Sequence, residues 1–163
     1  MSILKIETEL KGKSKILRAR SKEVVDIKSA EMQKLIKDMQ ETLAATENGI
    51  GLAAPQVGVN LRIFVASHAL ELNHTVFINP AIAKITDRTE TMEEGCLSLP
   101  GLCGRVKRAA SLKVAAYNER GRKFKMKVQG LAAQLVQHEV GHLDGELFKD
   151  KAEELLEIEK SKK

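Results

Sequence analysis

The sequence contains no tryptophan, one tyrosine and only four phenylalanines. Aromatic platforms for stacking bases are therefore scarce, so we expect no sequence-specific or single-strand nucleic-acid binding. Two cysteines, Cys96 and Cys103, are too few for a disulfide framework. No segment approaches the roughly 20 apolar residues of a membrane span, and the start of the chain lacks the apolar core of a signal peptide. These absences predict a reducing, cytoplasmic setting with no membrane partner.

Positive charge is in modest excess, with 27 Lys and Arg against 22 Asp and Glu, and many basic residues lie near the two ends. Charged ends are usually solvated surface, and the segment from about residue 151 is predicted to be such a tail. A weak association with an anionic partner, such as the RNA of the ribosome, is a secondary hypothesis. The length suits one compact domain, so we expect residues 1–163 to form a single unit.

The first half of the chain predicts one helix followed by strands. Apolar residues recur at helical spacing between residues 29 and 47, at Met32, Leu35, Ile36, Met39 and Leu43. Asn48 and Gly49 then supply a helix stop. Beyond a glycine-rich segment, residues 62–66 and 75–80 have the composition of strands.

The second half predicts a hairpin and two further helices. Residues 113–117 and 123–128 form strands around a short turn, and in the second strand apolar residues alternate with lysines. The run 131–143 predicts a helix, and residues 151–160 predict a third, polar helix. Strands that cluster before a late helix indicate an α+β fold rather than an alternating α/β fold.

A short motif on the predicted second helix indicates a metal site. His138 and His142 are four residues apart, so on a helix they project from one face and can bind one ion. Glu139, one residue after the first histidine, can reach a water on that ion. A chance match on a surface helix is the alternative, and a third protein ligand is needed to distinguish the two.

The third ligand is sought among several segments. The metzincin pattern fails, because Phe148 stands where its third histidine would be. Cys96, in the segment EGCLS, offers a thiolate beside Gly95, whose small size allows close approach. Cys96 is the best candidate, while Cys103 has no motif of its own. A thermolysin-like ligand from the charged tail remains open, with the candidates Glu153, Glu154, Glu157 and Glu159.

Three segments together resemble the signature motifs of the peptide deformylase family: GIGLAAPQVG at 49–58, EGCLS at 94–98 and QHEVGH at 137–142. Their order and spacing also match, and the similarity covers most of the chain up to about residue 151. The resemblance implies an α+β fold in which mainly antiparallel strands pack around a central HExxH-bearing helix, with an N-terminal and a C-terminal helix. It also implies hydrolytic removal of the formyl group from the N-terminal formyl-methionine of new polypeptides, with release of formate.

The family's functional residues can be carried onto this sequence one by one. The resemblance implies metal ligands at Cys96, His138 and His142, a general acid/base at Glu139, and oxyanion donors at the Gln56 side-chain amide and the Leu97 backbone N–H. Substrate contacts are assigned to Gly49, Ile50, Gly51, Glu94, Gly95 and Leu131. The glycines around Ile50 would let a peptide lie alongside as an added strand. The ion expected is one Fe(II), and a Cys and two His also suit Zn(II), Ni(II) or Co(II).

Two positions depart from the family pattern. Gly141 stands where an acidic residue usually precedes the second histidine, which loses a carboxylate and weakens the helix by up to about 1 kcal/mol. Cys103 stands where an arginine is typical, and Arg105 or Arg108 could serve instead. Two competing hypotheses remain: a small zinc peptidase, and a catalytically silent relative that binds formyl peptides, which is suggested only by Gly141. The expected location is the bacterial cytoplasm, with an organelle stroma or matrix as the alternative.

Overall fold

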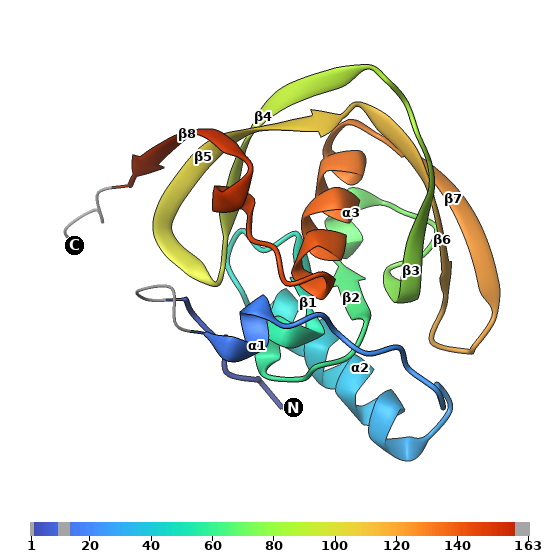
Figure 1. Cartoon of the computed structure of the whole chain (residues 1–163). Coiled ribbons are helices and arrows are strands. Elements are labelled where there is room, and N and C mark those ends of the chain that lie inside the picture. The colour runs from blue at the N-terminus through green and yellow to red at the C-terminus, as the bar shows by residue number, and fades with distance from the viewer. Residues whose placement is uncertain (1, 10–13, 159–163) are drawn as a thin grey trace.

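A computed structural model describes residues 2–9 and 14–158 (Figure 1). The α-helices are α1 (Lys15–Arg18), α2 (Ala30–Ala44) and α3 (Gly130–Leu143). Short 3₁₀ turns are η1 (Ala54–Val57), η2 (His68–Leu70) and η3 (Phe148–Asp150). The strands are β1 (Gly51–Ala53), β2 (Ile63–Ala66), β3 (Val76–Ile85), β4 (Thr89–Cys96), β5 (Leu99–Ala109), β6 (Ser111–Tyr117), β7 (Lys123–Gln129) and β8 (Ala152–Glu157).

The strands form two sheets, both antiparallel. One has five strands in the order β1-β2-β3-β6-β7, and the other has three in the order β4-β5-β8. Strands β4 and β5 make a long hairpin in which Thr89 faces Ala109 and Gly95 faces Cys103. Figure 1 shows this hairpin arching over α3, and α3 contacts strands of both sheets. The α+β arrangement with antiparallel strands is confirmed.

Helix α2 forms where the sequence predicted the first helix. Ser29 caps its start, because the Ser29 hydroxyl accepts a hydrogen bond from the Met32 amide at 3.2 Å. The face carrying Ile36, Met39 and Leu43 is buried against β1 and β2, which explains the helical spacing of those residues. The helix ends at Ala44, three residues before the predicted end, and Asn48 takes a left-handed conformation with φ of 60°.

The predicted hairpin is β6 and β7. The Asn118 carboxamide oxygen accepts hydrogen bonds from the amides of Arg120 and Arg122, and Gly121 supplies the positive φ that this turn requires. Alternate apolar residues of both strands face inward and join the core formed with Ala133, Leu135 and Val136 of α3. The alternation of apolar and lysine residues in β7 therefore separates a buried face from a solvent face, as predicted.

The segment 151–160 contradicts the prediction of a polar helix. Its described part is strand β8, which pairs antiparallel with β5 so that Arg105 faces Glu154. Helix propensity of the Glu and Leu residues is overridden because the open edge of β5 offers backbone partners. Leu147 and Phe148 are buried just before the strand and direct the chain along that edge. Residues 159 and 160 lie outside the described residues, and α3 is the α-helix nearest the C-terminus.

Buried ion pairs hold the N-terminal segment against the end of the chain. Glu9 is buried and binds Arg18 at 2.9 Å and Lys149 at 3.1 Å. Arg18 also binds Asp150 at 2.6 Å. This cluster therefore joins α1 to η3, which also contacts β4 and β5. Among the described residues, no helix is both long and apolar enough to cross a membrane.

Candidate active site

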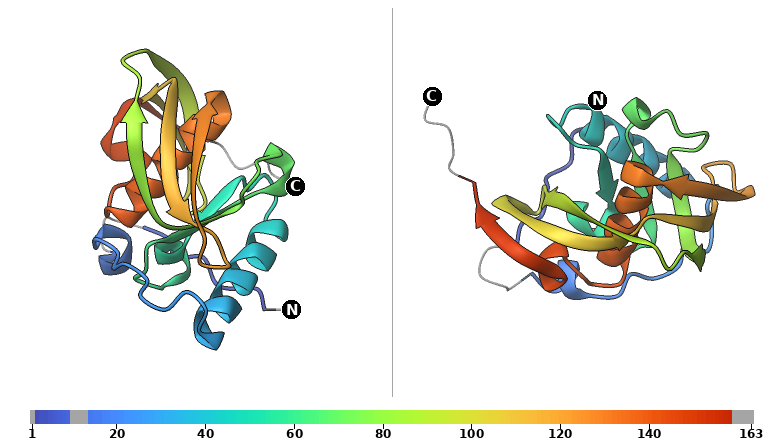
Figure 2. Two further views of the ribbon diagram at one scale, coloured as in Figure 1. Left: turned by 90° about the vertical axis from the view of Figure 1, so that its right-hand side faces the viewer. Right: turned by 90° about the horizontal axis from the view of Figure 1, so that it is seen from above.

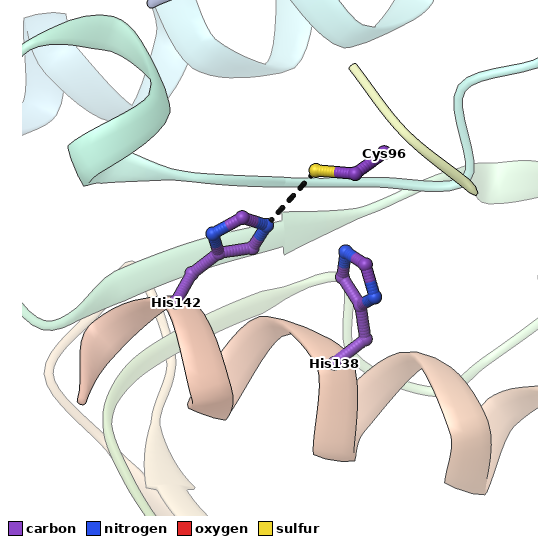
Figure 3. A group of neighbouring side chains, drawn as sticks. All are labelled: Cys96, His138 and His142. Carbon is purple, nitrogen blue, oxygen red and sulfur yellow. Dashed lines mark hydrogen bonds between the residues drawn. The ribbon is translucent and has the colours of Figure 1, made fainter. Parts of the chain in front are cut away.

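Two separate elements bring together a thiol and two imidazoles (Figure 3). Cys96 is the last residue of β4, and His138 and His142 lie one turn apart on α3. One ligand atom from each residue lies within 4.8 Å of the others, and Cys96 Sγ is 3.2 Å from His142 Nε2. The spacing predicted from the sequence is thus realised as a three-donor cluster.

Glu94 holds His138 in place. The His138 Nδ1–H donates to Glu94 Oε1 at 2.8 Å, which leaves Nε2 as the free ring nitrogen. Arg108 donates two further hydrogen bonds to the Glu94 carboxylate, each of 2.8 Å, and both side chains are buried. Burial alone would raise the pKa of Glu94, but hydrogen bonds from Arg108 and His138 lower it to about 2. Glu94 is therefore a fixed negative charge beneath the imidazole.

The two histidines differ in their ionisation. Burial alone would lower the pKa of His138, but hydrogen bonding with Cys96 and Glu94 raises it to about 10. Burial lowers the pKa of His142 well below its ordinary value, so that ring is neutral. The surroundings of His138 thus favour a positive charge at this ring, and an ion bound there would take the place of the proton, because a metal-ligating imidazole is neutral.

Glu139 is buried beside the cluster and is only 3 % exposed. Its Oε2 has no hydrogen-bond partner within the part of the chain that the structure describes. Burial raises the pKa of the Glu139 carboxyl to about 7. Gly51 lies against it, since a Cβ at residue 51 would be 2.8 Å from Glu139 Oε1. This carboxyl group is therefore free to exchange a proton at neutral pH.

Arg62 secures the end of α3 next to His142. Arg62 is buried, and one guanidinium nitrogen donates to the Leu143 carbonyl and to the Asp144 carboxylate, each at 3.0 Å. A cation at a helix C-terminus is favourable because unpaired carbonyls gather there. This contact could not be predicted from the sequence, because it joins the segment before β2 to the end of a helix more than 80 residues away.

Gln56 comes from η1, which follows β1. The Ala53 amide donates to Gln56 Oε1 at 2.9 Å, and this bond orients the carboxamide. The Gln56 amide nitrogen then points at the cluster, 3.5 Å from Cys96 Sγ and 3.2 Å from Ser98 Oγ. Gln56 is 1 % exposed, so its position is fixed by packing.

A cavity of about 560 Å³ opens over these side chains. It is lined by all but one of the residues predicted to act on the substrate or the ion: Gly49, Ile50, Gly51, Gln56, Glu94, Gly95, Cys96, Leu97, Leu131, His138 and Glu139. The exception is His142, which is 1 % exposed and lies beneath the cavity. The tail residues Glu153, Glu154 and Glu157 lie on β8 and are not part of the three-donor cluster, while Glu159 is outside the described residues.

Residues 5–157 match the family model described as polypeptide deformylase. The chain belongs to this family. Deformylation of N-formyl-methionine peptides is the function of polypeptide deformylases, which are metal-dependent hydrolases of protein biosynthesis.

Several deformylases resemble this chain along nearly all its length. Peptide deformylase 1 of Bacillus anthracis is 41% identical over 152 residues, which cover 93% of both chains. The Desulforudis audaxviator enzyme is 42% identical over 137 residues, 84% of this chain and 87% of its own. The crystal structure of peptide deformylase from Thermotoga maritima, 36% identical, superposes with a TM-score of 0.85 over 94% of this chain and all of that one. A Synechococcus elongatus deformylase in complex with actinonin has 38% identity and a TM-score of 0.84, covering 93% of this chain and 79% of its own.

The two departures from the deformylase pattern have structural answers. Arg105 and Arg108 lie three apart on β5, so they face opposite sides of the sheet. Arg108 is buried on Glu94, whereas Arg105 is exposed, so Arg108 is the one of the two that lies beside the donor cluster. At Gly141, a Cβ would meet Glu146 at an ordinary 3.8 Å, so nothing in the packing requires glycine there.

Proposed function

We propose that Cys96, His138 and His142 hold the catalytic metal ion of this deformylase. The three donors lie within 4.8 Å of one another, and their soft sulfur and imidazole atoms suit a divalent transition metal. The observation that carries the proposal is Glu139 Oε2, which has no partner among the described residues, because a buried carboxylate without a partner needs a reason. Fe(II) is our first choice of ion, with Zn(II), Ni(II) or Co(II) as alternatives. When bound, such an ion supplies a Lewis acid that makes water nucleophilic at neutral pH.

Glu139 is the proposed proton carrier. Water adds to the formyl carbon and gives a proton to Glu139 Oε2, and Glu139 returns it to the amine nitrogen as the carbon–nitrogen bond breaks. The products are formate and a free N-terminal methionine. A carboxyl group with a pKa near 7 is suited to both halves of this transfer.

The developing oxyanion requires fixed donors. We assign this role to the Gln56 side-chain amide, held by the Ala53 amide, and to the backbone N–H of Leu97. Each such donor typically lowers the activation barrier by about 3–4 kcal/mol. Glu94 lines the cavity, but both its oxygens are engaged with Arg108 and His138, so its role in our proposal is to orient His138 rather than to bind the peptide.

Substrate binding is assigned to the cavity wall formed by β1 and the adjoining residues. β1 is an edge strand, so a formyl-methionyl peptide can extend the sheet beside Gly49, Ile50 and Gly51. Ile50 and Leu131 are 36 % and 46 % exposed at the cavity and offer apolar surface to the methionine side chain. Gly95 leaves space for the peptide on the opposite side.

The setting is also part of the proposal. We infer a single catalytic domain that acts on nascent polypeptides in the bacterial cytoplasm, since relatives that cover most of this chain, such as peptide deformylase 1 of Bacillus anthracis, are bacterial. Weak association with the ribosome is consistent with the net charge of +5.

An anaerobic formate-release assay on formyl-Met-Ala-Ser, with metal analysis of the same sample, tests the proposal. The expected result is formate release in proportion to bound metal, with Fe(II) more active than Zn(II). New internal amines instead of formate would indicate a small zinc peptidase. Binding of the peptide by metal-loaded protein without release of formate would indicate a silent relative, and either outcome would overturn the assignment.

A further inference from the structure

One hairpin of the protein carries a clear excess of positive charge. Residues 111–129, which form β6, β7 and their turn, contain six basic residues and one acidic residue. The other 144 residues contain 21 basic and 21 acidic residues. The net charge of +5 is thus equal to that of this segment alone, which we call the basic hairpin.

The strand register gathers the lysines on one face. Lys113 of β6 is directly opposite Lys127 of β7, and Lys125 and Lys123 follow at every second position of β7. Their neighbours in sequence point the other way, into the core against α3. In the left view of Figure 2 this side of the molecule is turned toward the viewer, with α3 behind the strands. We call the surface formed by Lys113, Lys123, Lys125 and Lys127 the lysine face; Arg120 and Arg122 extend it at the turn.

The positive charges of the lysine face are not neutralised by ion pairs among the described residues. All four lysines and both arginines are exposed, and none takes part in an ion pair with another described residue. Like charges directly opposite each other in a sheet are destabilising, so the pair Lys113–Lys127 weakens the fold. Lysines on an edge strand can prevent edge-to-edge aggregation, but Lys113 lies on the second strand and contributes nothing to that protection.

We propose that the lysine face is a docking surface for the phosphate backbone of double-helical RNA. A row of cations along strands β6 and β7 matches a polyanion, and release of its counterions would drive the association. The face displays one aromatic residue, Tyr117, so contact through stacked single-strand bases is unfavourable. Among the described residues, no large exposed apolar side chain belongs to β6 or β7, which argues against insertion into a lipid surface. Duplex RNA is recognised mainly by its shape and its phosphates, so its binding requires neither aromatic platforms nor exposed apolar side chains.

The lysine face is separate from the catalytic cavity. None of the residues that line the cavity belongs to β6 or β7. RNA bound there would leave the cavity open, so the protein can be anchored on RNA while it acts on a peptide. Neutralising the lysine face should therefore leave deformylation unchanged.

The test is binding of a fluorescein-labelled RNA duplex of about 16 base pairs, followed by anisotropy between roughly 50 and 200 mM salt. The variant Lys123→Gln/Lys125→Gln/Lys127→Gln should bind at least about tenfold more weakly at the higher salt, and the slope of log K against log salt should fall by about 3. The matched control Lys5→Gln/Lys22→Gln/Lys37→Gln loses the same charge from exposed residues outside the hairpin. The control should retain most of the affinity.

Three outcomes would overturn the proposal: no binding of the duplex by wild-type protein at low salt, equal losses in the two triple variants, or tighter binding of anionic phosphatidylserine vesicles than of RNA. Formate release by both variants on formyl-Met-Ala-Ser should equal that of wild type, which verifies that they are folded. Aggregation of the hairpin variant with unchanged RNA affinity would assign the lysines to edge protection instead.

Discussion

Two carboxylates face the same cavity from different elements, and their surroundings are opposite. Glu94, on β4, has both oxygens engaged by Arg108 and His138, and its pKa is held at about 2. Glu139, on α3, has an oxygen without a partner among the described residues, and burial raises its pKa to about 7. Carboxylates whose pKa values are driven apart by their environments take different roles. Glu94 is built to stay charged, and Glu139 is built to change its protonation state.

Removing the ionisable group of Glu139 gives the largest expected effect. Glu139→Gln should lower kcat/KM for formate release by about 10²–10⁴-fold while bound metal stays at the wild-type level, because proton transfer is lost and the three donors remain. Formate release and metal content are measured on the same preparation. Glu153→Gln on β8 is the control and should behave as wild type. Near-normal turnover by Glu139→Gln would remove this residue from the reaction.

Filling the space beside Glu139 should also impair the reaction. In Gly51→Ala the new Cβ overlaps Leu135 Cδ1 and lies 2.8 Å from Glu139 Oε1, so the carboxylate must shift. A displacement of this kind costs on the order of 10²-fold in kcat. The double variant Gly51→Ala/Leu135→Ala relieves the overlap with Leu135 but keeps the contact with Glu139. Low activity in both variants would assign the loss to the displaced carboxylate of Glu139. Wild-type activity in Gly51→Ala would contradict the proposed role of this carboxylate.

Breaking the pairing of Glu94 should damage stability more than chemistry. Glu94→Gln leaves the buried Arg108 charge unpaired, and we expect a loss of about 3–5 kcal/mol in the free energy of unfolding. Metal affinity should fall about 10–100-fold because His138 loses its orienting carboxylate. The double variant Glu94→Gln/Arg108→Met should recover part of the unfolding free energy but not the metal affinity. Denaturant unfolding measures the stability, and metal titration measures the metal affinity. Recovery of both quantities in the double variant would show that the two effects of Glu94 are not separate.

The paired type of carboxylate also occurs outside the site, at Glu9. Burial alone would raise the pKa of Glu9, but hydrogen bonds from Arg18 and Lys149 hold it below its ordinary value of 4.5. The stabilisation is therefore complete above pH 4.5 and is lost as the pH falls through the lower, folded-state pKa. Glu9→Gln should be less stable than wild type at neutral pH, and the difference should shrink in acid. Thermal unfolding across this pH range measures it, and a difference that grows in acid would reverse the assignment.

The smallest effect is expected at Gly141, two residues after Glu139 on α3. Gly141→Ala should stabilise the protein by about 1 kcal/mol, because alanine favours helix and its Cβ meets only Glu146 at 3.8 Å. A rise in Tm of about 2–4 °C is expected for a chain of this length, with unchanged formate release. Loss of activity in Gly141→Ala would show that this position affects His142 in a way that the packing does not reveal.

Elements with a strong local pattern could be predicted from the sequence. The apolar spacing of α2 and the alternation in β7 are properties of single segments, and both appear close to the expected bounds. The long hairpin of β4 and β5 was not predicted, because its stability depends on pairing between strands and its sequence is rich in glycine and charge. β8 was predicted as a helix for the related reason that only the open edge of β5 makes it a strand.

The residues of the candidate site also differ in whether they could be predicted from the sequence. The residues of the three donors and Glu139 could be proposed because HExxH and EGCLS resemble family motifs. Their partners could not, since Arg108 is distinguished from Arg105 only by the face of β5 on which it lies. A strand assignment for residues 99–109 would have identified it, because Val106 and Arg108 then share the inner face. Arg62 had no local signal at all, as its partners lie at the far end of α3.

The arrangement of the donors also has a consequence for how the chain reaches its final form. Cys96 belongs to the three-stranded sheet, whereas His142 lies 46 residues later on a helix that also packs against the other sheet. An ion shared by these residues would close a long loop and fasten the two sheets to each other, much as a disulfide would in an oxidising compartment. Chelation should therefore loosen the contact between the sheets before it disrupts either one. Acquisition of the ion would accordingly be a late event in folding, since the loop must form before the three donors can meet.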